Sequence, residues 1–346
     1  MHSGAPRWAP GEAWSVDPGP VLVLGGETED PDQQFSAITS AFRLSDGSIA
    51  IADLRLSQIL VYSVEGKLLR TMGRKGAGPG EFLTLDVVER IDDDSIAAWD
   101  IDGTVVVFDP EGHHVRTRED LKRVRSYGGV TPLADTGLFG WEEGYWVTEG
   151  VVRIPRILIR GNVEGARIDT LGVWPGHAVA WAQGDDGEAH GWTVPFTTGS
   201  LKAGGGTPWR LVVGTGEEAY LELFDERGHR VKSVSWAARG RPISRSRWEK
   251  VLAEGGSQLA AVDPPEFAPV YYALAIDSIG DIWAQHHPFP EDTEDVWTVL
   301  DPEGVWLGEV SVPAGCEIKS IGGDYLLCRF RDEMRIERLT MFHLRR

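Results

Sequence analysis

Short apolar runs alternate with tight turns along most of the chain, and one ten-residue arrangement of them recurs five times. In each copy an apolar strand leads into a turn with glycine at the seventh position, and a second apolar strand follows. The copies occupy residues 60–69, 106–115, 159–168, 222–231 and 298–307. Repetition of this kind over a whole chain predicts an architecture built from one small repeated unit.

The first unit, residues 41–73, predicts four strands joined by short turns. Asp46-Gly47 and Glu65-Gly66 are hairpin signals between β-rich runs. The strands are expected at about 38–44, 48–53, 58–63 and 67–72, and residues 91–117 repeat the pattern. One sheet of this size leaves both faces apolar and is not stable alone, whereas radial stacking buries both faces, as in a β-propeller.

The number of blades follows from the turn glycines and from the two ends of the chain. The repeated glycines at 66, 112, 165, 228 and 304 mark five blades. Residues 316–344 supply three strands without a fourth, while residues 21–26 form a strand without a blade. We expect residues 21–24 to complete the last sheet, which removes its open edge. The sequence therefore predicts an all-β, six-bladed β-propeller with four antiparallel strands per blade, closed by this N-terminal strand.

The domain organisation predicted from the pattern is simple. Residues 14–346 form one propeller domain, and residues 1–13 are an N-terminal extension. Residues 244–256 interrupt the strands between the fourth and fifth blades. Ser246 and Glu249 have the spacing of a capping box, and Gly255 is a stop signal, so a short helical insertion is expected there. Both a surface decoration and a partner-binding element fit this insertion.

The net charge of the chain limits the kinds of molecule that it is expected to bind. The chain has 53 acidic and 34 basic residues and a net charge of −19, which repels nucleic acid and slows approach to anionic lipid. We therefore expect no nucleic-acid partner. No apolar run is long enough to span a bilayer, and the first residues lack the features of a signal peptide. Either the protein stays in the cytoplasm or an export signal has been removed.

Two cysteines, Cys316 and Cys328, are too few for a zinc ribbon. They lie on two predicted strands joined by Gly322-Gly323. A cross-strand disulfide forms if the register places them opposite each other, and two buried thiols are the alternative.

The residues at 47–82, GSIAIAD followed by ILVYSVEGKLLRTMGRKGAGPGEF, are similar to repeats of the NHL type. With DIWAQ (281–285) and the segments 297–313 and 332–344, the chain from about 14 to 344 resembles bacterial six-bladed β-propeller proteins of largely unassigned function. The resemblance implies a monomeric ring with a periplasmic or extracellular location. Residues 54–57 do not place Asn and Arg as the NHL pattern typically does before the third strand, which puts an NHL-specific protein or RNA partner in doubt.

One mouth of the ring carries a candidate ligand-binding constellation. Loops that join the second strand to the third emerge on one face. Five residues take equivalent positions after the second strand, the last of them only approximately: Asp53, Asp100, Glu142, His286 and Arg329. Together they could hold a cation or a basic ligand. The alternative is that each Asp accepts backbone N–H bonds within its own turn.

Four tryptophans define a second candidate surface. The stretch 172–210 reads as long and irregular, with Gly and Pro throughout. It carries Trp174, Trp181, Trp192 and Trp209, which as loop aromatics would stack on a saccharide or anchor a protein partner.

The sequence is compatible with two functions. The favoured one is a non-catalytic binding or scaffolding propeller that presents loops to a protein, peptide or saccharide. The alternative is a metal-dependent hydrolase or lyase with a divalent ion, calcium or zinc, on the channel axis. The single asparagine, Asn162, falls at the outer rim on the other face, and the nine histidines are scattered. We therefore predict no metal site or cofactor and leave catalytic residues unassigned.

Overall fold

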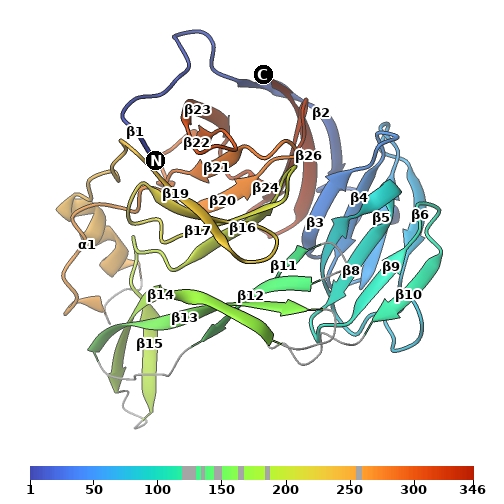
Figure 1. Cartoon of the computed structure of the whole chain (residues 1–346), viewed down its shortest axis with the longest axis horizontal. Coiled ribbons are helices and arrows are strands. Elements are labelled where there is room, and N and C mark those ends of the chain that lie inside the picture. Colours follow the sequence, from blue (N-terminus) through green and yellow to red (C-terminus); the bar gives the residue numbers. More distant parts are fainter. Residues whose placement is uncertain (119–129, 134–136, 144–149, 163–166, 184–187, 255–258) are drawn as a thin grey trace.

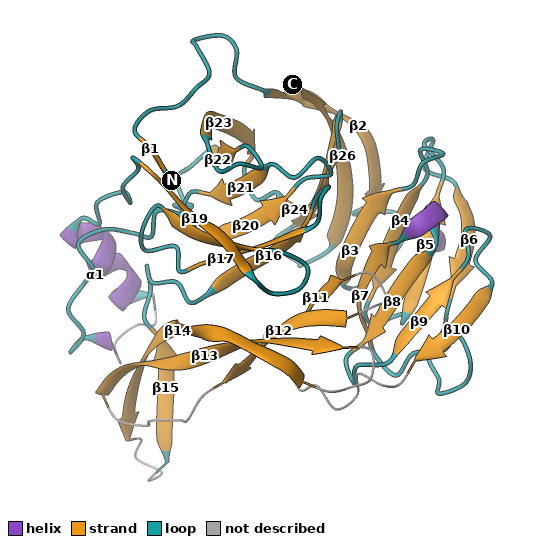
Figure 2. Ribbon diagram, in the orientation of Figure 1, coloured by secondary structure: helices purple, strands orange, loops and turns teal. Residues whose placement is uncertain are grey.

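The computed structural model describes residues 1–118, 130–133, 137–143, 150–162, 167–183, 188–254 and 259–346. Within these residues the strands form six sheets, arranged as blades around one axis (Figures 1 and 2). The predicted all-β, six-bladed propeller is confirmed. Its blades are numbered here in chain order, with strands a to d running from the axis outward.

The strands of the first three blades follow the predicted order. Blade 1 contains β3 (Ile38–Arg43), β4 (Ile49–Asp53), β5 (Gln58–Tyr62) and β6 (Leu68–Met72). Blade 2 contains β7 (Leu85–Arg90), β8 (Ile96–Asp100), β9 (Val105–Phe108) and β10 (His114–Arg118). Blade 3 contains β11 (Val130–Leu133), β12 (Gly137–Glu143), β13 (Gly150–Asn162), β14 (Arg167–Gln183) and a fifth strand, β15 (Ala189–Thr193).

The other three blades complete the ring. Blade 4 contains β16 (Leu201–Gly205), β17 (Arg210–Gly214), β18 (Tyr220–Phe224) and β19 (Arg230–Trp236), with β1 (His2–Ser3) paired parallel to β19. Blade 5 contains β20 (Ala273–Ile276), β21 (Ile282–Gln285), β22 (Glu294–Leu300) and β23 (Trp306–Pro313). Blade 6 contains β24 (Glu317–Ile321), β25 (Tyr325–Arg331), β26 (Glu337–Arg345) and β2 (Ser15–Gly25).

Blade 6 closes the ring as predicted. Strand β2 pairs antiparallel with β26, with Leu22 opposite Met341 and Leu24 opposite Leu339. These four side chains are buried with residues of blade 1 in one cluster. The N-terminal strand therefore covers the edge of β26 and packs against the next blade.

The turns of the repeat behave as their residues predict. The glycines at 66, 112, 228 and 304 all have φ between 80 and 93°, a region that costs glycine little because it has no Cβ. Gly165, in the remaining copy, lies outside the described residues. In the fourth copy Asp225 Oδ1 accepts backbone N–H bonds from Arg227 and His229, both at 2.9 Å. An acidic side chain thus fixes the turn that glycine permits.

The core consists of apolar layers between neighbouring blades. Separate buried clusters join blades 1 and 2, blades 6 and 1, blades 4 and 5, and blades 5 and 6. A smaller one joins blades 3 and 4. The sheets of blades 1, 4, 5 and 6 thus take part in such a cluster on both sides, as the stacking of repeats predicts.

Antiparallel connectivity assigns every loop to one of two faces. Loops between strands b and c, and those from strand d to the next strand a, emerge on one face, called the upper face here. Loops between a and b and between c and d emerge on the opposite, lower face.

Blade 3 departs from the regular repeat. The first residues of β13 and the last of β14 extend past β12 on the upper side, and β15 pairs with that extension, Ala180 opposite Trp192. Figure 1 shows these three strands, called the arm here, reaching away from the ring. The expectation that residues 172–210 are irregular is therefore wrong, since β14, β15 and β16 occupy most of them.

The predicted insertion between blades 4 and 5 contains helix α1 (Arg245–Ala253). Its N-cap is Ser244, whose Oγ accepts from Arg247 N at 3.2 Å, so the expected cap at Ser246 is wrong. Glu249 instead forms an ion pair with Arg245. Gly255 lies outside the described residues. Short 3-10 turns occur at Pro31–Gln33 and Asp92–Asp94.

The cysteines form the Cys316–Cys328 disulfide, with Cα atoms 5.0 Å apart. Of the two alternatives left open by the sequence, the cross-strand bridge is the one observed. It ties the start of β24 to the middle of β25 in the closing blade.

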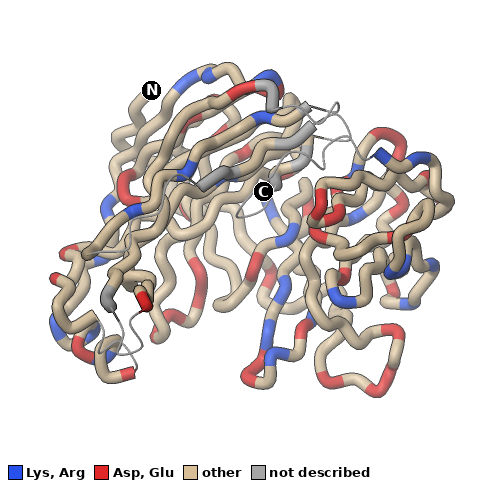
Figure 3. The backbone as a smooth tube through the Cα atoms, turned by 90° about the horizontal axis from the view of Figure 1, so that it is seen from below, with Lys and Arg blue, Asp and Glu red and all other residues tan. Residues whose placement is uncertain are grey.

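Residues 1–13 lie along blades 4 and 5, where Trp8 N donates to Leu307 O and the Trp8 ring packs on Trp14 at 4.9 Å. The division into an extension and a propeller domain stays a prediction. No described helix has the length and apolar character needed to cross a membrane. Figure 3 shows acidic and basic residues interspersed along the described chain.

Candidate functional site

Asp53 and Asp100, the first two residues of the predicted constellation, anchor loops on the upper face. Asp53 ends β4 and is fully buried. Its Oδ2 accepts from Ser36 N at 2.6 Å and Ala37 N at 3.2 Å, while Oδ1 accepts from Arg55 N and Leu56 N at 3.0 Å. The carboxylate therefore joins the loop that enters blade 1 to the loop between β4 and β5.

Asp100 anchors the loop that enters blade 2. Its Oδ2 accepts from Leu83 N at 2.5 Å, and its Oδ1 accepts from Thr84 N at 3.1 Å. The contacts of Asp53 with Arg55 and Leu56 are the turn contacts that the sequence offered as the alternative to ligand binding. Asp100 accepts instead from the loop that precedes β7, and in both residues these contacts occupy the carboxylate oxygens. A ligand-binding role for Asp53 and Asp100 stays a prediction.

Arg329 belongs to a buried charge cluster at the junction of blades 6 and 1. Its guanidinium donates to Ile38 O at 2.7 Å and pairs with Glu337 and Glu317. Glu337 Oε2 in turn accepts from Ile38 N at 2.5 Å. Glu337, which the sequence analysis did not single out, therefore anchors the start of β3 in blade 1, as Asp53 anchors its loops. No sequence signal marks it, because its partner Ile38 is at the other end of the chain.

His286 and Glu142 occupy separate blades. His286 follows β21, and its Nε2 lies 2.9 Å from Thr298 Oγ1 and 3.7 Å from Glu309 Oε1. Burial lowers the pKa of this imidazole. Since Thr298 and Glu309 belong to strands c and d, the ring points along blade 5 away from the axis. Glu142 lies in β12, where its backbone pairs with that of Ile157 in β13. The side chain of Glu142 lies outside the described part of the chain.

No contact joins Asp53, Asp100, His286 or Arg329 to one another in the described part of the chain. Each instead contacts its own blade or the adjoining loops. The structure thus places the predicted residues on the expected side of the ring without bringing them together.

The four tryptophans separate into two pairs. Trp209 stacks on Phe139 with centroids 5.5 Å apart, and Trp174 meets Phe224 edge-on at 6.2 Å. This first pair fills the layer between blades 3 and 4. Trp192 and Trp181 lie on β15 and β14 of the arm, and Trp192 packs against the cluster that contains Trp248 of α1. A partner-binding role for the four stays a prediction.

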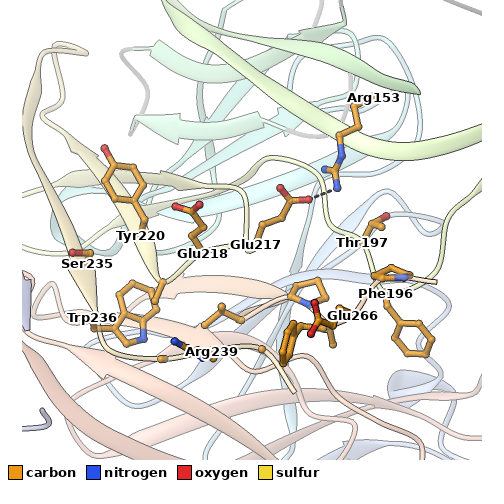
Figure 4. A pocket seen from close by; sticks show the side chains of 18 residues that line it. Arg153, Phe196, Thr197, Glu217, Glu218, Tyr220, Ser235, Trp236, Arg239 and Glu266 are labelled. Carbon is orange, nitrogen blue, oxygen red and sulfur yellow. Dashed lines mark hydrogen bonds and ion pairs between the residues drawn. The ribbon is translucent and has the colours of Figure 1, made fainter. Parts of the chain in front are cut away.

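A groove of about 870 Å³ opens on the upper face between the arm, blade 4 and the segment that leads to blade 5 (Figure 4). Arg153 of the arm donates to Thr198 O at 2.8 Å and to Gly176 O at 3.2 Å, and it pairs with Glu217. Buried Trp236 lies at the base, and Tyr220 and Phe267 are exposed at the edge. Glu218, Arg239 and Glu266 add charge of both signs. Sequence reasoning missed this groove because no local pattern shows how the arm, blade 4 and the segment after blade 4 pack against one another.

Exposed apolar side chains gather on the upper face as a whole. They come from the loops b–c and d–a of several blades, or from residues next to those loops: Leu56, Leu83, Ile101, Tyr220, Phe267, Tyr272 and Met334. Ile101 is 69% and Met334 68% exposed. Among the described residues, the lower-face loops carry Val64 and Ile279 as exposed large apolar side chains, and Leu69, Val115 and Val231 lie near those loops on the outer strands. The loops of the upper face therefore carry more exposed large apolar side chains than the loops of the lower face.

A cavity of about 520 Å³ occupies the axis and is lined by strand a of every blade. Lys202 and Lys319 are among its lining residues. Metal-ligating side chains gather elsewhere: in the described chain, Asp109, Glu111 and His113 approach one another on an exposed turn of blade 2. That turn is a c–d loop on the lower face, at the outer rim.

Comparison with known proteins supports the fold. Residues 27–127 match a family described as a 6-bladed beta-propeller. No curated protein matches the sequence. A putative exported protein from Bacteroides fragilis is similar in structure, with 15% identity and a TM-score of 0.52, over 100% of this chain and 98% of that one.

Two further solved structures are similar. A member of the DUF4221 family from Bacteroides vulgatus has 14% identity and a TM-score of 0.50, over 95% of this chain and 98% of its own. The PQQ-bound aldose sugar dehydrogenase from Streptomyces coelicolor has 11% identity and a TM-score of 0.48, over 96% and 98% of the two chains. At these identities the likeness concerns the fold, and the activity of that enzyme is not transferred to this chain.

Proposed function

We propose that this protein is a binding propeller whose upper face receives a protein or peptide partner. The observation that carries the proposal is the concentration of exposed apolar side chains on the upper-face loops, with Ile101 and Met334 as the most exposed of them. Exposed apolar patches on a soluble protein mark interaction sites more often than they mark accidents of packing. The ring supplies a rigid support for these loops, because their bases are anchored by buried Asp53, Asp100 and Glu337.

The groove beside the arm fits this function. Its exposed Tyr220 and Phe267 offer apolar contact area, while Glu218, Arg239 and Glu266 offer polar contacts around it. Apolar anchors surrounded by polar groups are the usual anatomy of a protein interface. Residues 238–240 and 265–270 form walls of the groove together with Arg153 of the arm, so departures from the repeat lie where the partner would bind.

A location outside the cytoplasm agrees with two observations. Disulfides persist in oxidising compartments, and the closing blade contains Cys316–Cys328. The similar protein from Bacteroides fragilis is described as a putative exported protein. An oxidising periplasm or an extracellular space is therefore the compartment that we propose.

A binding function is better supported than the alternative function of a metal-dependent hydrolase or lyase. The axial cavity is lined by two lysines, and a cationic side chain opposes a divalent ion at the same place. The metal-ligating side chains that do approach one another in the described chain lie on an outer turn.

A face-selective cross-linking experiment tests the proposal. A photoreactive phenylalanine analogue is placed at Ile101 or Met334 on the upper face, and at Val64 or Ile279 on the lower face as matched controls. Each full-length protein is illuminated in an envelope extract of the source organism. We expect one discrete cross-linked product from the two upper positions and none from the two lower ones. Equal labelling from both faces, or none from the upper face, would overturn the proposal.

A further inference from the structure

A pocket of about 610 Å³ lies between helix α1 and blade 5, and it shares Phe196 with the groove described above. Its walls come from α1, from the loop between β21 and β22, and from residues 195–196 between β15 and β16. Trp248 and Leu252 of α1 pack against the arm on a different face of the helix. The side chains of α1 that line the pocket are spaced three and four residues apart and so share one face: Arg247, Lys250, Val251 and Glu254.

The blade 5 wall of this pocket is held in place by two arginines. Arg241 Nη1 and Nη2 donate to Asp292 at 2.6 and 2.9 Å, and Asp292 Oδ2 also accepts from Phe289 N at 2.7 Å. The guanidinium groups of Arg241 and Arg247 both lie over the Phe289 ring, 3.9 and 3.8 Å from its centre. Because these contacts fix the loop before a ligand binds, little conformational entropy is lost on binding.

Phe196 forms another part of the wall, and its backbone is strained. Its φ of 56° falls in the left-handed region, where a bulky residue loses about 1 kcal/mol or more. The Phe196 ring lies 5.6 Å from the His287 ring and 6.0 Å from the Phe289 ring, between centroids. Strained residues of this kind cluster at ligand sites, where the surrounding structure holds them in position.

The charged side chains that line the pocket are already paired with one another. Arg247 Nη1 donates to Glu291 Oε2 at 3.1 Å, and Lys250 Nζ lies 3.8 Å from Glu254 Oε1. A charged ligand would therefore have to compete with an existing ion pair for every ionic contact. Burial lowers the pKa of His287, so this imidazole is neutral at pH 7. The pocket thus favours an uncharged ligand.

We propose that this pocket binds an uncharged aromatic molecule that carries an amide group. The ligand ring packs against Phe196 and the three prolines that line the pocket, Pro195, Pro288 and Pro290. The amide forms a hydrogen bond with His287, since a neutral imidazole has one N–H donor and one acceptor nitrogen. A volume of about 610 Å³ is within the ordinary range of ligand sites, roughly 300–1,000 Å³. This site goes beyond the proposed partner-binding function and does not depend on it.

An NMR titration of the full chain tests the preference for an uncharged aromatic ligand. The probe is indole-3-acetamide, with indole-3-acetate and tryptamine as its anionic and cationic counterparts and octanamide as its aliphatic counterpart. We expect the probe to bind about tenfold more tightly at pH 7 than either charged counterpart, because their charges lose water without gaining a free partner. It should bind about fivefold more tightly than octanamide, which has no ring to pack against Phe196.

Three variants locate the site. His287→Phe keeps an aromatic ring but removes both nitrogens, and it should weaken binding of indole-3-acetamide about fivefold. Val251→Trp fills the space beside the helix and should abolish binding. Glu249→Gln, on the same helix but outside the pocket, is the matched control and should leave binding unchanged. Urea denaturation of each variant checks its folding.

Several results would overturn the proposal. They are equal binding of the neutral and charged probes, equal binding of the probe and octanamide, unchanged binding in His287→Phe, and retained binding in a folded Val251→Trp protein. The cross-linking positions Ile101 and Met334 lie outside the pocket. Failure of this site and failure of the partner-binding function are therefore distinguished.

Discussion

The upper and lower faces of the ring both contain buried acidic residues, but they compensate them differently. On the upper face, Asp53 and Asp100 accept hydrogen bonds from backbone N–H groups of adjoining loops. On the lower face, Asp277 and Asp281 lie in one hairpin of blade 5. Asp277 Oδ1 also accepts backbone N–H bonds from Ile279 and Asp281, at 3.1 and 2.8 Å, but here a cation is added: Arg346 pairs with both carboxyls, at 2.5 and 2.8 Å. The Arg346 guanidinium also lies 4.2 Å above the Trp14 ring.

The two ways of compensating buried carboxylates have different structural consequences. Backbone donors compensate an upper-face carboxylate at every pH at which it is ionised, and they keep loop bases rigid beneath exposed apolar tips. The lower-face pair depends on a cation from a distant segment, which joins the start of β2 and the end of β26 to blade 5. The rigid loop bases of the upper face agree with the binding function proposed for it, and the Arg346 contacts on the lower face contribute to closure of the ring.

The largest effect is expected from Asp53→Ala. This change leaves the N–H groups of Ser36, Ala37, Arg55 and Leu56 without their acceptor. We expect the free energy of unfolding to fall by about 3 kcal/mol, measured by urea denaturation. Asp46→Ala, at an exposed lower-face turn of the same blade, is the control and should cost less than about 1 kcal/mol. Equal losses in the two variants would contradict the loop-anchoring role.

Arg346→Ala is expected to cost about 2 kcal/mol at pH 7, because it leaves two buried carboxyls facing each other. The loss should shrink at pH 5, where the Asp281 carboxyl, whose pKa burial raises to about 6, takes up a proton. Denaturation of the variant and the parent at both pH values measures this. Arg345→Ala, whose partner Asp17 lies at the surface, serves as the comparison. A loss that does not change with pH would exclude the Asp277–Asp281 pair as its cause.

A smaller, pH-dependent effect is expected from Asp281→Asn. Burial, together with the charge of Asp277, raises the pKa of Asp281 to about 6. Because the folded-state pKa lies above the unfolded one, the neutral carboxyl favours folding below about pH 4, and this contribution is lost as pH rises through 6. Relative to the parent, Asp281→Asn should therefore gain up to about 2 kcal/mol between pH 4 and pH 7. A relative stability that falls over this range would show that the pKa is not raised.

The smallest effect on stability is expected at the exposed apolar tips. Ile101→Ser and Met334→Ser should change the free energy of unfolding by less than about 0.5 kcal/mol, since neither side chain is packed. The same changes should reduce binding of a hydrophobic dye, whereas Val64→Ser on the lower face should reduce it less. A loss above about 1 kcal/mol would mean that these side chains contribute to the fold rather than to a surface.

The candidate sites could be predicted only in part. Sequence alignment of the blades placed Asp53 and Asp100 at the ends of their strands, and both are there. It could not decide what their oxygens contact, because the donors Ser36 and Leu83 precede them by 17 residues. His286 was aligned correctly after its strand, yet its ring turns toward Thr298 and Glu309 within the blade. The tryptophans of 172–210 were misread because Gly and Pro there are accommodated in long paired strands.

The sequence by itself determined the strand-and-turn repeat, the six blades and the closing strand, because alternation and turn chemistry act between residues that are close in the chain. Only the tertiary structure decided which charges meet. Glu337 reaches Ile38 across 299 residues, and Arg346 reaches Asp277 across 69. Blade packing also brings Lys202 and Lys319 into one axial cavity and assembles the groove from the arm and blade 4. Such contacts depend on the radial position of whole sheets, which no local pattern encodes.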